Sequence, residues 1–322
     1  MSHGSGGKAT GELIRDVFSE KLGNGILNRM EDAAVFSLDP GEGSADPDRA
    51  KADPDAGKAA ACRGAYTTDS FVVSPIVFKG GDIGRLSVCG TVNDLLCMGA
   101  TPKAMTAGFI IEEGLDTEVL GQIASSMACA LEEAGTRIVA ADTKVVEGSG
   151  GLYINTSGIG IIPEGVHIGA DMLEEGDEIL VSGTLGNHHA CILSHRMEIE
   201  NDIKSDVAPL NQMVGALLDN HVRVKAMRDI TRGGLNELCR SSGVSALVNH
   251  RAIPVSESVR GLCGILGLDP FYMGNEGKLL IVVHPEDKDR ALKLICSSPY
   301  GGNAAHIGSV GEGGGVFATT DT

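Results

Sequence analysis

Tryptophan is absent from this chain of 322 residues, and aromatic residues make up only 3% of it. Any core must therefore be built from aliphatic side chains, and a hydrophobic share of 42% is enough for that. Positive charge is also scarce, because 26 Lys and Arg face 43 Asp and Glu, for a formal net charge of -17. This balance argues against nucleic acid as a partner, since binding it normally requires a basic surface.

Long apolar runs and metal-type cysteine pairs are missing as well. No run of about 18 apolar residues occurs and the N-terminus has no apolar leader, so we expect neither a membrane span nor secretion. We therefore expect a cytoplasmic protein. The eight cysteines include no Cys-x-x-Cys pair, which disfavours a zinc site and favours buried free thiols. Cys89 and Cys97 share one face of a predicted helix and are expected in the core.

Two familiar phosphate-binding patterns are also lacking. "GSGGKAT" has no first glycine at the Walker A spacing and no Ser or Thr after its lysine. No Gly-x-Gly-x-x-Gly follows a strand and opens a helix. Phosphate binding, if present, must use another design.

The pattern of apolar residues predicts an α/β (α+β) protein in two domains. A change of composition at 163–176 separates a first domain, 1–162, from a second, 163–322. Residues 39–64 are rich in Pro, Gly, Asp and Ala and are expected to form a flexible surface loop. The principal expected strands are 32–36, 65–73, 101–111, 136–146, 152–162, 277–285 and a closing strand at 304–310. The principal expected helices are 82–100, 116–134 and 286–297, and 177–193 is expected to form a strand, a glycine turn and a helix.

Carboxylates stand at the ends of apolar segments. Asp69 and Asp142 each end a predicted strand, and Asn93 and Asp94 lie inside an otherwise apolar helix. A buried carboxylate must be paired or must bind a metal, and Mg²⁺ prefers such oxygen ligands. Lys144 follows Asp142 and Thr143 in the sequence and could place a positive charge on a phosphoryl group. The alternative is that these acids cap helices and turns.

Two glycine-rich stretches add further candidates. In "RDITRGG", Asp229 and Thr231 could cap a helix whose glycines leave N–H groups open to an anion. In "GNEGK", Glu276 stands between glycines and is a candidate acid/base group, although a plain turn is equally compatible with the sequence. His188 and His189 point in different directions on a helix, so we expect surface or capping roles for them.

Together, "HGSGGK", "TTDSFVVSPIVFKGGDIGRLSVCGTVNDLLCMGA", "FIIEEGL", "ADTKVV", "RDITRGGLNE" and "NEGKL", in this order, resemble the hydrogenase expression/formation protein HypE family of carbamoyl dehydratases. That family belongs to the superfamily of aminoimidazole ribonucleotide synthetase, selenophosphate synthetase and thiamine-monophosphate kinase. The resemblance covers residues 3–312 apart from the predicted loop.

The resemblance implies the two-domain fold of this superfamily, with the N-terminal domains of a homodimer pairing their sheets into a barrel-like arrangement. It implies ATP and Mg²⁺, with a glycine-rich N-terminus closing over the phosphates. The implied nucleotide-binding residues are Gly4, Gly6, Gly7, Lys8, Asp69, Asn93, Asp94, Asp142, Thr143, Thr231, Arg232, Gly233 and Gly234. The implied metal ligands are Asp69, Asp94 and Asp142, and Lys144 and Glu276 match positions suited to proton transfer or phosphoryl stabilisation.

The implied reaction is the ATP-dependent dehydration of a thiol-bound carbamoyl group to a thiocyanate, which supplies cyanide ligands for nickel–iron hydrogenase. The implied partners are a HypF-like carbamoyltransferase and an iron-scaffold maturation complex. The family's acceptor is a cysteine at the very C-terminus, whereas this sequence ends "GGGVFATTDT" and its last cysteine is Cys296. Two alternatives stay open: a relative that phosphorylates a small oxyacid or amide, and a non-catalytic scaffold.

Overall fold

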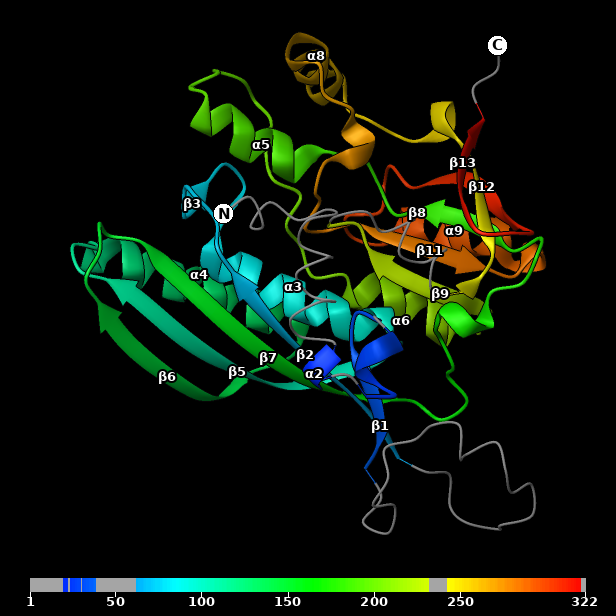
Figure 1. Cartoon of the computed structure of the whole chain (residues 1–322), viewed down its shortest axis with the longest axis horizontal. Helices are drawn as coiled ribbons and strands as arrows, with labels where there is room; N and C mark the ends of the chain where they lie inside the picture. Colours follow the sequence, from blue (N-terminus) through cyan, green and yellow to red (C-terminus); the bar gives the residue numbers. More distant parts are fainter. Residues whose placement is uncertain (1–19, 23, 30, 39–61, 232–241, 320–322) are drawn as a thin grey trace.

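The structure, a computed structural model, describes residues 20–22, 24–29, 31–38, 62–231 and 242–319 (Figure 1). Two β-sheets, one in each half of the chain, form its framework. Several sequence predictions lie outside the described residues: those on Gly4, Gly6, Gly7, Lys8, Arg232, Gly233 and Gly234, and nearly all of the 39–64 loop.

The first half folds around a five-stranded sheet in the order β1-β2-β7-β5-β6. Neighbouring strands are antiparallel except β5 and β6, which are parallel and are joined through a helix. The elements of this half are α2 (Glu20–Leu22), η3 (Leu27–Arg29), β1 (Ala34–Ser37), β2 (Arg63–Phe71), β3 (Val77–Phe78), β4 (Gly81–Asp82), α3 (Ile83–Cys97), β5 (Thr101–Glu112), α4 (Thr117–Ala134), β6 (Ile138–Val146) and β7 (Leu152–Ile162).

Two helices pack on one face of this sheet, and both form where the sequence predicts them. Helix α3 begins after Asp82, whose carboxylate accepts the Arg85 N–H, and ends three residues earlier than expected. Helix α4 ends at Gly135, which has the positive φ of 65° that glycine accommodates. Almost every α3 side chain is buried, because the helix lies between the sheet and the second half of the chain. Cys89 and Cys97 are buried on it, as predicted.

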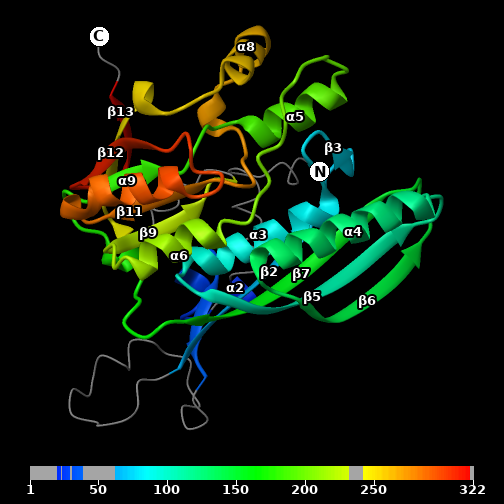
Figure 2. The same ribbon diagram turned by 180° about the vertical axis from the view of Figure 1, so that it is seen from behind.

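The second half contains a six-stranded sheet in the order β13-β10-β12-β8-β11-β9 (Figure 2). Its strands are β8 (Glu178–Val181), β9 (Val224–Asp229), β10 (Ser245–Asn249), β11 (Leu279–Val283), β12 (Ala305–Gly311) and β13 (Gly315–Thr319). Its helices are η5 (Ala170–Met172), α5 (Asn187–Arg196), α6 (Asn211–Asp219), η6 (His250–Ala252), α8 (Glu257–Leu266), η7 (Pro270–Tyr272), η8 (Pro285–Asp287) and α9 (Lys288–Ser297).

The prediction that the strand at 304–310 closes the fold was wrong. Strand β13 follows β12 and pairs in parallel with β10, another strand that the sequence did not predict. Glycine at 313, 314 and 315 concealed the short apolar run after it, because glycine is typical of turns and weakens strands.

One large apolar cluster joins the two halves. It runs from α3 and α4 to α6, α9 and β11, and includes Val92, Met127, Leu217, Ile281 and Ile295. Helix α3 contacts β9 and α6 directly, so the halves meet along this helix. In the described part of the chain, no helix has both the length and the apolar character that crossing a bilayer requires.

The cysteines are only partly buried. Cys62, Cys129 and Cys296 are exposed, so the prediction of a fully buried thiol set was wrong for these three. Cys129 illustrates the reason. Helix α4 buries Met127 and Ala130 on the face that packs against the protein, whereas Cys129 points away from that face into solvent.

Candidate functional site

The first sheet places two of the predicted metal ligands on opposite faces. Asp69 pairs with Thr156, and the same row of the sheet ends at Ala141 on β6. Asp142 is the next residue, and successive residues of a strand point to opposite faces. Asp69 lies on the face that α3 covers, because a Cβ on Gly90 of that helix would lie 3.7 Å from its Oδ2. One chain therefore does not bring Asp142 to Asp69.

On the covered face, Asp69 belongs to an acidic cluster drawn from both halves of the chain. Asp94 comes from α3, Asp32 precedes β1, and Asp229 ends β9. The Thr67 hydroxyl lies 2.9 Å from Asp94 Oδ2 and 3.1 Å from the Asp32 carbonyl oxygen, which ties these two segments together. Thr231 Oγ1 is 3.4 Å from Asp229 Oδ1. We refer to Asp32, Asp69, Asp94 and Asp229 as the acidic cluster.

The pKa values show that these four carboxyls interact. Burial raises the pKa of Asp229 to about 8, with further contributions from the negative charges of Asp32 and Asp69. Burial likewise raises the pKa of Asp94 well above its usual range, and Asp229, Asp32 and Asp69 add to the shift. Like charges this close favour a bound cation or a bound proton.

Arg228 lies beside the cluster and offsets part of its charge. The Arg228 guanidinium lies 3.5 Å from Asp32 Oδ1 and 3.6 Å from Glu31 Oε2, and its side chain is only 8% exposed. Asp32 Oδ2 is buried and accepts no hydrogen bond from the described residues. A buried carboxylate oxygen in this position is suited to a hard cation such as Mg²⁺.

The side chains of the described residues do not form a ready set of three metal ligands. A Mg²⁺ ion at the acidic cluster would take its remaining oxygens from water and from a phosphate chain, which is the usual arrangement for this ion. The residues therefore fit a metal that arrives with a nucleotide.

Asp142, Thr143 and Lys144 lie apart from the cluster, on the exposed edge strand β6. Lys144 Nζ is 2.9 Å from Asp142 Oδ2, and this contact lowers the pKa of the aspartate. Asp142 and Lys144 share the uncovered face of the sheet, whereas Thr143 points to the other face.

Asn93 holds the two halves of the chain together. Its Nδ2 donates to the carbonyl oxygens of Ala208, at 3.0 Å, and Glu276, at 3.5 Å. Its Oδ1 accepts the Leu210 N–H at 3.0 Å. Asp94, the next residue, belongs to the acidic cluster. Two adjacent residues of α3 therefore contribute to different parts of the junction, one to the contact between the halves and one to the cluster.

Glu276 lies in the turn before β11, at the same junction. Its N–H donates to Asp206 Oδ1 at 3.2 Å, and Asp206 Oδ2 lies 3.4 Å from Lys278 Nζ. Asn275 fixes the preceding residues, because its amide donates to Ile230 and Met273 and accepts the Gly186 N–H. With the Asn93 contact from α3, the turn that carries Glu276 is therefore tied to four other segments.

Several of these residues were missed by the sequence analysis as members of a site: Asp32, Asp206, Arg228, Asn275 and Lys278, with Asp229 considered only as a cap. Asp229 could have been found, because it ends a strand in the structure, which is the position where the sequence analysis looked for carboxylates. Asp206 could not, since it lies in an irregular segment with no local pattern around it.

The prediction for His188 was wrong. The residue is 8% exposed and its ring packs edge-on against Phe78, with centroids 5.4 Å apart. Its Nδ1 lies 2.8 Å from Ser205 Oγ. Burial lowers its pKa to about 4, so the ring is neutral at physiological pH. Helix α5 turns its first residues inward, and the sequence of "NHHA" does not reveal which histidine faces the core. His189 is exposed, as predicted.

Comparison with known proteins identifies the two halves separately. Residues 53–162 match the N-terminal domain of AIR synthase related proteins, and residues 174–321 match the C-terminal domain of the same group. Carbamoyl dehydratase HypE of Azotobacter vinelandii is 44% identical over 318 residues, which cover 96% of this chain and 87% of that protein.

Solved structures give the same result over nearly the whole chain. A crystal structure of a HypE–HypF complex contains a chain that is 41% identical, with a TM-score of 0.84, covering 96% of this chain and 97% of its own. A crystal structure of the hydrogenase maturation protein HypE in complex with ATP is 40% identical, with a TM-score of 0.77, covering 98% of this chain and 93% of its own.

Proposed function

The chain belongs to the HypE family of hydrogenase maturation proteins and has its two-domain AIR synthase related fold, and we propose that it is an ATP-dependent carbamoyl dehydratase. The observation that carries the proposal is the convergence of the acidic cluster and Glu276 on one junction between the halves. A relative that is 40% identical has been crystallised with ATP, which supports the same ligand here.

We place Mg-ATP at the acidic cluster. Asp32, Asp69, Asp94 and Asp229 would line the metal site, and the ion would complete its coordination with water and phosphate oxygens, offsetting the negative charge of the phosphates when bound. The proposal extends the predicted ligands Asp69 and Asp94 by two carboxylates. The remaining predicted nucleotide-binding groups, Gly4, Gly6, Gly7, Lys8, Thr231, Arg232, Gly233 and Gly234, stay predictions.

In the proposed reaction, the carbonyl oxygen of a thiol-bound carbamoyl group attacks the γ-phosphorus of ATP, and the bond to ADP breaks. The nitrogen then loses its two protons and the carbon–oxygen bond breaks, which leaves a thiocyanate and inorganic phosphate. Glu276, whose turn is fixed at the junction, would accept one of these protons, and the departing phosphate would take the other.

We propose that the functional unit is a homodimer. Helices α3 and α4 cover one face of the first sheet, and no described element covers the other, here called the outer face (Figures 1 and 2). The outer face carries Tyr66, Ile110 and Val146, which are 46%, 46% and 40% exposed. An exposed apolar sheet face of this kind is typical of an interface, and a second copy covering it agrees with the predicted barrel-like pairing.

This arrangement also gives Asp142 and Lys144 a role. Both lie on the outer face, from which they cannot join the acidic cluster of their own chain. We propose that Asp142 and Lys144 complete the site of the second copy, where Lys144 would stabilise the transferred phosphoryl group. Thr143 points to the covered face, and its role in nucleotide binding stays a prediction.

We also propose a HypF-like carbamoyltransferase as the partner, because a relative that is 41% identical has been crystallised in a HypE–HypF complex. The second proposed partner is an iron-scaffold maturation complex that would receive the cyanide; this proposal rests on the resemblance to the family alone. The seven cysteines in the described part of the chain are free thiols, which suits the reducing cytoplasm that we propose as its location.

The activity can be tested with the purified chain, Mg-ATP and a peptide whose cysteine carries a carbamoyl group. We expect phosphate release and the loss of one water from the peptide, read by mass spectrometry, in equal amounts. Glu276→Gln should retain ATP binding and lose the dehydration. Phosphate release with a small oxyacid but not with the peptide would favour the other superfamily chemistry, and no ATP turnover under any condition would contradict the proposal.

A further inference from the structure

The backbone of Glu276 is held on both sides by side chains from distant parts of the chain. Its N–H donates to Asp206 Oδ1 at 3.2 Å, and its carbonyl oxygen accepts from Asn93 Nδ2 at 3.5 Å. Asn93 comes from α3 in the first half, and Asp206 comes from the irregular segment before α6. The orientation of Glu276 therefore depends on contacts that its own turn does not supply.

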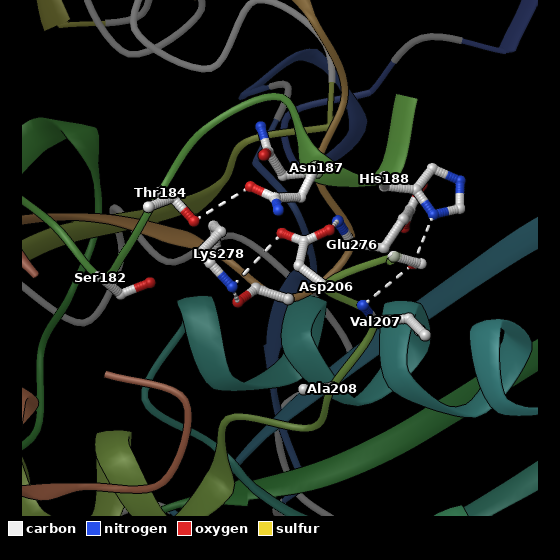
Figure 3. A network of polar contacts seen from close by, with 12 residues as sticks. Ser182, Thr184, Asn187, His188, Asp206, Val207, Ala208, Glu276 and Lys278 are labelled. Carbon is white, nitrogen blue, oxygen red and sulfur yellow. Dashed lines mark hydrogen bonds and ion pairs between the residues drawn. The ribbon is translucent and has the colours of Figure 1, made fainter. Parts of the chain in front are cut away.

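Asp206 belongs to a buried ion pair (Figure 3). Its carboxylate is 6% exposed and lies 3.4 Å from the ammonium of Lys278, whose side chain is 8% exposed. Lys278 Nζ also donates to the Gly277 carbonyl oxygen at 2.9 Å. Burying two charges costs free energy that their mutual attraction often only offsets, so such a pair is weak grounds for a purely stabilising role.

Glycines provide the space for this pair. A Cβ on Gly277 would lie 1.9 Å from the Asp206 backbone oxygen, and a Cβ on Gly183 would lie 2.7 Å from Lys278 Cε. A side chain at position 277 would require the backbone to move, and one at position 183 would displace the Lys278 side chain. The segments 182–186, 205–208 and 274–278 are thus packed around Asp206 and Lys278.

We propose that Asp206 is a positioning residue for Glu276: it accepts the Glu276 N–H, and Lys278 balances its buried charge. The inference rests on the proposed function, which gives Glu276 its proton-transfer role. Proton transfer requires a donor and an acceptor at hydrogen-bond distance, and a shift of about 1 Å can lower the rate by about a hundredfold. Asp206 itself lies behind the turn and is not assigned any contact with substrate.

The test compares Asp206→Ala, which removes the acceptor, with Asp206→Asn, which keeps an amide oxygen for the Glu276 N–H. We expect Asp206→Ala to lower kcat for dehydration by about tenfold or more while KM for ATP changes less than about twofold. Asp206→Asn should recover most of the lost kcat. Hydrogen exchange at the Glu276 amide should be faster in Asp206→Ala and close to wild type in Asp206→Asn.

Asp287 offers a matched control at the opposite end of β11. It is 8% exposed and accepts both the Arg223 backbone N–H, at 3.0 Å, and Arg223 Nε, at 2.7 Å. Asp287→Ala therefore also removes an aspartate that joins a backbone N–H to a basic side chain. We expect it to leave kcat within about twofold of wild type even if it lowers Tm.

An unchanged kcat in Asp206→Ala, or an Asp206→Asn variant as slow as Asp206→Ala, would overturn the inference. If Asp206→Ala does not fold, the double variant Asp206→Asn with Lys278→Met takes its place, because it removes both buried charges and keeps the acceptor. That variant should retain most of the kcat, and a loss of more than about tenfold would again overturn the inference. Full activity in Glu276→Gln would contradict the proposed function instead, while exchange at the Glu276 amide would still report on Asp206.

Discussion

Single carboxylates behave differently in this protein according to the surface around them. Asp142 is exposed and paired with Lys144, so its pKa falls, whereas Asp229 is buried beside other acids, so its pKa rises to about 8. Asp229 ends β9 and Asp142 lies inside β6, but both follow apolar residues, and the sequence alone does not separate them. Burial and neighbouring charge decide which of them can respond to a cation near neutral pH.

The pKa of Asp229 predicts how the stability of the ligand-free protein depends on pH. Because the folded chain binds this proton more tightly than the unfolded chain, the contribution of Asp229 is fully present below its usual pKa of 3.8 and is lost as the pH rises through about 8. We expect Tm to fall less steeply between about pH 5 and pH 8 in Asp229→Asn than in wild type. Thermal denaturation at a series of pH values measures this.

Magnesium should counteract the same loss. Added MgCl₂ should raise the Tm of the wild type more at about pH 8 than at about pH 6, since the cation favours ionised carboxylates. Asp229→Asn should reduce this effect, and Asp219→Asn, at the exposed end of α6 and outside both halves of the proposed site, serves as the control. Equal pH slopes in wild type and Asp229→Asn would contradict the assignment.

At the scale of elements, the turn before β11 is positioned by its contacts and by the absence of side chains. Gly274 also contacts the end of β9 closely, because a Cβ there would lie 2.8 Å from the Thr231 carbonyl oxygen. Together with Gly277, it allows the turn to lie against two other backbone segments. Glycine is needed here for close approach, since neither residue has a positive φ.

Gly277→Ala should therefore destabilise the protein. Its Cβ would lie 1.9 Å from a backbone oxygen, and relieving such an overlap costs about 1 to 3 kcal/mol. Gly261→Ala is the matched control, because Gly261 lies within α8 and has no atom within 4 Å of the new Cβ. We expect Gly277→Ala to lower Tm. Gly261→Ala should leave Tm unchanged or raise it, because alanine is about 0.5 to 1 kcal/mol more favourable than glycine inside a helix. Equal Tm values for both variants would show that the turn can move.

At the scale of the whole molecule, the proposed site is divided between two copies. Each chain would supply its acidic cluster to one site and its Asp142 to the other. The outer face, with its exposed Tyr66, Ile110 and Val146, is the surface through which this exchange would occur.

Mixed dimers test this division. Asp69→Asn and Asp142→Asn should each abolish ATP turnover alone, whereas co-expressed chains should recover activity, because one of the two sites in each mixed dimer is then intact. Asp69→Asn with Asp94→Asn is the control, since both substitutions lie in the acidic cluster and leave no intact site. Recovery in the control, or no recovery in the first pair, would contradict a site shared in this way.

The sequence by itself determined the local structure of the first half and the chemical type of the site. Helices α3 and α4 and the turn with Glu276 follow from apolar period, caps and glycines, because each signal lies within a few residues. The predicted strand ends at Asp69 and Asp142 were wrong, since β2 continues to Phe71 and β6 to Val146. The sequence analysis did not predict strands β10 and β13, because short apolar runs beside glycine are also typical of loops.

Only the tertiary structure decided which of these residues meet. Strand register put Asp142 on the face opposite Asp69, and packing between the halves brought Asp32 and Asp229 to Asp94. Asp206 reached Glu276 through a segment with no pattern of its own. Contacts between residues far apart in sequence depend on how whole elements pack, and no spacing along the chain records that.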